Sequence, residues 1–191
     1  MARVNSRTCN GLGAEMKCGS CGHVIAKGEK YLFAKPGFRT RRPLIRCLKH
    51  PFRESDLITG NRQEIVRAKE DALDAIDGAD TFEDLASAMS EFESAADDYL
   101  SMREEALDQW PNGNSQLEEY RDQAQAIVDE VSGWTADYSD GDEPDDEDLD
   151  RIHEEMGDEP HSRGDLVELW LQEKLDEAKD AARYVLEGLD A

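Results

Sequence analysis

The stretch "MKCGSCGHVIAKGEKYLFAKPGFRTRRPLIRCLKH", residues 16–50, decides the fold of the N-terminal part of this chain. It holds two pairs of metal-ligand residue types, Cys18 with Cys21 and Cys47 with His50, and two residues separate the members of each pair. Short C-x2-C and C-x2-H turns each deliver two ligands to a tetrahedral zinc ion. The spacing therefore predicts one structural Zn²⁺ with four protein ligands and no open position for an activated water.

The residues between the two pairs predict a small sheet. Residues 24–33, "VIAKGEKYLF", are typical of a strand, a glycine turn and a second strand, and residues 35–46, "KPGFRTRRPLIR", are typical of a basic loop. A hairpin between two metal-binding turns indicates a treble-clef-like finger. In such a finger the second turn opens a short helix, here residues 48–57, although Pro51 disfavours its first turn.

The segment "CGSCGHVIAKGEKY", residues 18–31, resembles the opening of the fingers of poly(ADP-ribose) polymerases and of small zinc-finger proteins of actinobacterial phages, which share a C-x2-C-x3-I-x-K-G-E/S pattern. The resemblance covers about residues 16–55 and implies zinc ligation by the four residues of the two pairs. The polymerase fingers close with His and then Cys, whereas this chain closes with Cys47 and then His50. Their recognition of DNA breaks is therefore not carried over.

All four cysteines lie within the first 47 residues. In a reducing compartment such a local cluster more often binds metal than forms disulfides. Cys9 has no partner two residues away, so we expect a free thiol there. The alternative is that Cys9 replaces His50 as the fourth ligand.

Charge divides the chain into two regions. Residues 1–53 carry twelve Lys and Arg against two acidic residues, a formal charge of +10, and the remaining residues carry −33, which together give the net charge of −23. Hydrophobic residues make up 38% of the chain and charged residues 35%, a balance that predicts a thin core and disfavours a compact α/β enzyme. We expect a basic finger followed by an acidic helical body.

The body shows apolar residues spaced three and four apart, the pattern of amphipathic and coiled-coil helices. Two long stripes, one from Phe82 to Trp110 and one from Leu117 to Tyr138, flank the turn "PNGN" at 111–114 and predict an antiparallel helical hairpin. Thr81 and Asp84 predict a capping box at the start of the first stripe. A final stripe predicts a third helix that completes a three-helix bundle. The fold class is mainly α with a small zinc-bound α+β region. The expected parts are a finger (1–60), a short helix plus the hairpin (61–138), an acidic linker with at most a helical turn (139–163) and a C-terminal helix packing on the hairpin (164–191).

A cluster of basic residues predicts contact with nucleic acid or with a protein partner. Its members are Lys35, Arg39, Arg41, Arg42, Arg46 and Lys49. These charges could instead dock on the acidic helices of the same chain. In the alternative hypothesis the acidic body is the active part, as a mimic of DNA charge or an inhibitor of a host nucleic-acid-binding protein. The simpler explanation of the acidic residues is that they only keep the helical bundle soluble.

Other chemistry is not indicated. The sequence has no phosphate-binding loop, dinucleotide fingerprint, nucleophile elbow or histidine pair of a zinc protease. We therefore expect a non-enzymatic binding protein without a small-molecule substrate. The first residues lack the apolar core of a secretory signal, and no apolar run reaches the roughly 18 residues that span a bilayer. These features predict a cytoplasmic protein, in the host cytoplasm if it is phage-encoded, with no membrane partner.

Overall fold

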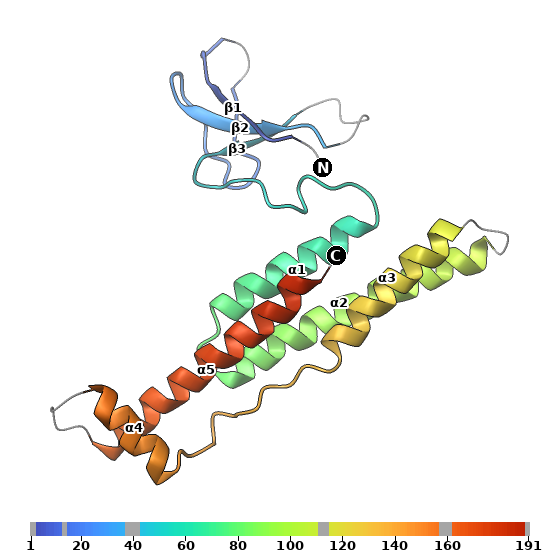
Figure 1. Ribbon diagram of the computed structural model, residues 1–191. Helices are drawn as coiled ribbons and strands as arrows, with labels where there is room; N and C mark the ends of the chain where they lie inside the picture. The colour runs from blue at the N-terminus through green and yellow to red at the C-terminus, as the bar shows by residue number, and fades with distance from the viewer. Residues whose placement is uncertain (1–2, 13–14, 37–42, 111–114, 157–161, 190–191) are drawn as a thin grey trace. The chain divides into compact units, whose positions relative to one another are not determined.

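The computed structural model of this chain describes residues 3–12, 15–36, 43–110, 115–156 and 162–189. They form three strands and five helices and divide into two compact units. We call residues 1–70 the finger unit and residues 71–191 the helical unit, and each is described by itself (Figure 1). The predicted class is confirmed in outline, since the chain is mainly helical with a small antiparallel sheet.

The sheet of the finger unit has the order β1-β2-β3, with both pairs antiparallel (Figure 1). Its strands are β1 (Asn5–Thr8), β2 (Lys30–Ala34) and β3 (Leu44–Cys47). The central strand β2 pairs with β1 on one side and with β3 on the other.

The predicted hairpin within residues 24–33 is only half right. Its second strand exists as β2, but its first half forms a single bridge between Val24 and Lys17. The edge of β2 is occupied instead by β1, whose pairing continues beyond the strand where the amide of Cys9 donates to the carbonyl of Glu29 at 2.8 Å. The end of the predicted basic loop is also a strand, β3. The strand β1, which is distant in sequence, thus pairs with β2 in place of the adjacent residues 24–27.

The helix expected over residues 48–57 is absent, because the residues described there form turns and bends. Pro51 has no amide hydrogen to donate. The carboxylate of Asp56 also accepts a hydrogen bond from the amide of Arg53 at 3.2 Å, and such local side-chain bonds compete with helix formation.

Helix α1 (Arg62–Asp77) begins after these turns, and its first half belongs to the finger unit. There the carboxylate of Glu70 accepts from the amide of Glu54 at 2.6 Å and from the hydroxyl of Ser55 at 2.5 Å. Ser55 is buried, and Ile65 and Val66 are nearly inaccessible. These contacts hold the turns against the first part of α1.

The helical unit is organised around a hairpin of α2 (Phe82–Gln109) and α3 (Ser115–Val131), whose connecting "PNGN" lies outside the described residues. The predicted cap of α2 is present, because the hydroxyl of Thr81 accepts from the amide of Asp84 at 3.1 Å. The predicted α2 stripe is buried over most of its length: Phe82, Leu85, Met89, Phe92, Ala96 and Tyr99.

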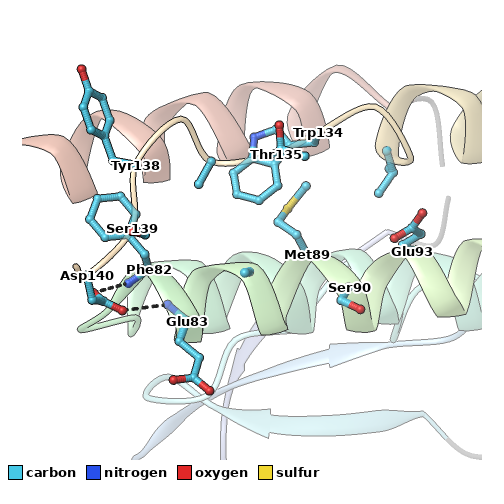
Figure 2. Close-up of a pocket in the computed structure, with 13 residues that line it drawn as sticks. Phe82, Glu83, Met89, Ser90, Glu93, Trp134, Thr135, Tyr138, Ser139 and Asp140 are labelled. Carbon is cyan, nitrogen blue, oxygen red and sulfur yellow. Dashed lines mark hydrogen bonds between the residues drawn. The ribbon is translucent and has the colours of Figure 1, made fainter. Parts of the chain in front are cut away.

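Helix α3 ends seven residues earlier than its apolar stripe predicts. Ser132 and Gly133 form a turn after Val131, and residues 134–138 are not helical. The ring of Tyr138 meets that of Trp170 edge-on at 5.3 Å. Figure 2 shows the carboxylate of Asp140 beside the start of α2, where it accepts from the amide of Phe82 at 3.0 Å. The segment is therefore held by tertiary contacts that a continued helix would not make.

The acidic stretch predicted as a linker contains a three-turn helix, α4 (Asp146–Met156). The carboxylate of Asp145 accepts from the amide of Asp148 at 2.8 Å and caps the helix, and acidic residues in the first turn favour its dipole. Leu149 and Ile152 are buried, and α4 packs against α5. The prediction of a linker was wrong because it was based on the acidic composition of the segment and gave no weight to these two apolar residues.

Helix α5 (Arg163–Gly188) starts with a capping box between Ser162 and Asp165. It contacts α4 and both helices of the hairpin, α2 and α3. Near its end Arg183 pairs with Asp77 of α1 at 2.7 Å. Within the described part of the chain, none of the helices has the length and apolar character required to cross a membrane.

Candidate metal centre

The four predicted ligands come together in the finger unit. The ligand atoms of Cys18, Cys21, Cys47 and His50 all lie within 4.8 Å of one another. The sulfur of Cys47 is 3.9 Å from the sulfur of Cys21 and 3.2 Å from Nδ1 of His50. None of these cysteines forms a disulfide. Two turns that lie 25 residues apart in the sequence thus build one cluster.

The spacing of the cluster fits a metal ion of the size of zinc. A tetrahedral site with Zn–S bonds of about 2.3 Å and Zn–N bonds of about 2.0 Å places two sulfurs about 3.8 Å apart and a sulfur and a nitrogen about 3.5 Å apart. The observed 3.9 Å and 3.2 Å are close to these values. Three thiols and an imidazole also form a donor set that soft or borderline metals prefer.

The first metal-binding turn is shaped by backbone hydrogen bonds. The amide of Cys18 donates to the carbonyl of His23 at 2.8 Å, and the amide of Gly22 donates back to the carbonyl of Cys18 at 2.9 Å. Gly22 has a φ of +70°, a left-handed conformation that favours glycine. The amide of Gly19 donates to the carbonyl of Ile45 at 2.8 Å, which attaches this turn to β3.

The second turn begins at the last residue of β3 and is braced by Arg46. The guanidinium of Arg46 donates to both carboxylate oxygens of Asp56, at 3.0 and 3.1 Å, and lies over the ring of Phe52 at 5.5 Å. A Cβ at Gly19 would lie 2.8 Å from a guanidinium nitrogen of Arg46, so a larger residue there would displace this guanidinium. The brace fixes the segment that carries Cys47.

The thiols of the cluster influence one another. Burial by itself would raise the pKa of Cys18. Hydrogen bonds from the amides of Cys21, Cys47 and Ser20 outweigh this effect and lower the pKa to about 6. The amide of His23 lowers the pKa of Cys21, yet desolvation and the neighbouring thiols raise it above its ordinary value. Negative charge on one sulfur therefore disfavours charge on the next, and a bound cation would remove this repulsion.

Cys9 is not part of the group of four ligands. Its side chain is buried, and its sulfur lies 3.6 Å from the carbonyl oxygen of Ile25. The structure thus supports His50, and not Cys9, as the fourth member of the cluster.

The basic residues predicted to contact a partner have different surroundings. Lys35 and Lys49 are exposed, whereas the side chain of Arg46 is only 16% exposed and is paired with Asp56. Arg39, Arg41 and Arg42 lie outside the described residues. Arg46 is therefore a positioning residue of the metal-binding turn. Sequence reasoning missed this role because Asp56 shows no spacing pattern that links it to Arg46.

Comparisons with known protein families, with curated proteins and with solved structures find no match to this chain. The similarity to polymerase and phage fingers stays a prediction that depends on residues 18–31.

Proposed function

We propose that this chain is a zinc-binding, non-enzymatic interaction protein whose finger unit is treble-clef-like and binds nucleic acid. The cluster of three thiols and one imidazole carries this proposal, because its donor set and spacing suit a structural Zn²⁺. Cys18, Cys21, Cys47 and His50 would hold the metal. Bound zinc would supply cross-linking between the two turns and no reactive position, since the protein provides all four ligands.

The charge of the finger unit supports nucleic acid as the partner. Residues 1–70 contain fifteen Lys and Arg against six Asp and Glu, a formal charge of +9. Lys35 and Lys49 are exposed in the described structure and are available to phosphates. Neutralising backbone phosphates releases counterions, which is the main source of sequence-independent binding.

A second candidate function concerns the helical unit. Residues 71–191 contain seven Lys and Arg against thirty-nine Asp and Glu, and five of these basic residues already pair with carboxylates of the same unit. The unit therefore keeps a charge of −32, which favours binding to a basic protein surface as a mimic of DNA charge.

Metal analysis tests the first part of the proposal. Protein purified without chelator should contain one zinc per chain, and a metal-free preparation that is nevertheless folded would disprove it.

Titration of labelled DNA and RNA with the full chain separates the two candidate functions. The finger proposal expects direct binding that weakens steeply as salt is added. The mimic proposal expects no direct binding, and expects the chain to displace DNA from a basic DNA-binding protein.

A further inference from the structure

We propose that one face of the finger sheet, formed by Arg7, Tyr31 and Phe33, is a stacking platform for the bases of single-stranded nucleic acid. The inference rests on the proposed function and specifies its ligand. It uses residues that the predicted basic cluster does not contain.

The two aromatic residues lie on the same face of β2. Successive side chains of a strand alternate between faces, so Tyr31 and Phe33 share one face while Leu32 and Ala34 share the other. Their ring centroids are 6.2 Å apart at an interplanar angle of 46°. Both side chains are partly exposed. Two rings at this spacing offer adjacent flat surfaces to neighbouring bases.

Arg7 extends this surface on the neighbouring strand. It is directly opposite Tyr31 in the register of β1 and β2, and its guanidinium lies 4.8 Å from the centroid of the Phe33 ring. All four residues of β1 are exposed, so none of the described residues of the finger unit covers this edge of the face. A guanidinium plane also stacks on bases, and its charge attracts the phosphate between them.

The opposite face of the sheet is already engaged within the finger unit. Ala34 is fully buried on that face, and Arg46, opposite Leu32 in the register, is held by Asp56. On the face with the two rings, buried Cys47 of the metal cluster lies directly opposite Tyr31 on the β3 side. The part of this face that the described residues leave for a ligand is therefore its β1 side, beside Arg7.

The chemistry of the face favours single strands over duplexes. Every base has a π-face, but a duplex hides these faces in its stack, whereas a single strand exposes them. The surrounding charge of +9 on the finger unit complements a phosphate backbone. A purely apolar protein partner would gain nothing from this charge.

The test compares ring-deleting variants of the full chain by fluorescence anisotropy at low salt. The probes are labelled oligo(dT) and a duplex of the same length. Oligo(dT) should bind more tightly than the duplex, and Tyr31→Leu and Phe33→Leu should each weaken its binding about tenfold. The ring-keeping variants Tyr31→Phe and Phe33→Tyr should bind as the wild type does.

A control outside the finger unit is Tyr184→Leu, since Tyr184 of α5 is 82% exposed. It should leave the affinity unchanged. Zinc content is measured for every variant, so that loss of the fold is distinguished from loss of a ring.

A second measurement requires no variant. Photo-crosslinking of an iodouracil-substituted oligonucleotide to the wild-type chain should label β1 or β2. Labelling confined to other segments, or leucine variants that keep their zinc and bind as tightly as the wild type, would overturn the platform and leave the proposed function standing. A zinc-loaded wild-type chain that binds neither probe would overturn both.

Discussion

The thiol of Cys18 in the metal cluster is positioned by backbone groups from two segments of the chain. The sulfur of Cys18 receives amide hydrogen bonds from both metal-binding turns, and its pKa is lowered to about 6 although burial alone would raise it. Cys9, only nine positions earlier, is buried beside the carbonyl of Ile25 and outside the cluster. Residue type alone does not distinguish these two cysteines, whereas their surroundings do.

Replacing Cys47 by Ser should abolish stoichiometric zinc binding, because a structural site needs all four ligands. The finger unit should unfold while the helical signal of residues 71–191 persists in circular dichroism, since the two units have separate compact contacts. The control is Cys9→Ser, which should keep its zinc because Cys9 lies outside the cluster. Full zinc content in Cys47→Ser would contradict the assignment of the site.

Gly22→Ala should weaken zinc binding by roughly fivefold. A left-handed conformation costs a residue with a Cβ about 1 kcal/mol, and the free energy of metal binding is coupled to folding. Competition with a chromophoric chelator measures the change. Gly188→Ala is the matched control, because Gly188 has no positive φ and a Cβ there would meet no atom within 4 Å. Equal affinities of the two variants would argue against strain at the first turn.

Among the elements, α4 shows how few apolar residues are enough to order a charged segment. The segment has an acidic first turn and a cap, but an isolated helix of 11 residues is marginal in water. Burial of Leu149 and Ile152 against α5 supplies the missing stabilisation. A short helix of this kind depends on its neighbour far more than on its own propensity.

Leu149→Ala should lower the free energy of unfolding of the helical unit by about 2 kcal/mol, because it removes a buried leucine side chain. Urea denaturation followed by tryptophan fluorescence measures the loss, since the buried Trp170 reports on α5. Met156→Ala is the control on the same helix, where the side chain is 45% exposed, and should change stability little. A similar loss in both variants would indicate that α4 is not held by this apolar contact.

On the scale of the whole molecule, charge is separated between the two units, with +9 on residues 1–70 and −32 on residues 71–191. The helical unit has few basic residues, and these form ion pairs such as that of Arg151 with Glu173 at 2.8 Å. Most of its carboxylates are left without a basic partner because they are in large excess. The excess repels itself, which disfavours the compact state.

Added sodium chloride should therefore raise the thermal midpoint of the helical unit. If screening recovers about 1 kcal/mol, the midpoint rises by about 5 °C. Tryptophan fluorescence follows the helical unit selectively, because all three tryptophans lie in it. A midpoint that falls with salt would mean that attractive pairs outweigh the repulsion.

Much of the outline could be predicted from sequence. The C-x2-C and C-x2-H spacings marked four ligands that the structure brings within 4.8 Å of one another. The Thr81 cap and the stripe from Phe82 to Tyr99 located α2. These signals work because a turn, a cap or a helix face is encoded by residues only a few positions apart.

The tertiary structure decided the features that depend on distant residues. It paired β2 with β1 across more than twenty residues, ended α3 at Val131 where its stripe continued, and made α4 a helix by placing it against α5. It also brought Arg46 onto Asp56 and placed the half-buried rings of Tyr31 and Phe33 beside Arg7 of the neighbouring strand. Local sequence determines what a segment is able to form, but the free energy that selects among these forms comes from burial and pairing with segments that only the folded chain brings close.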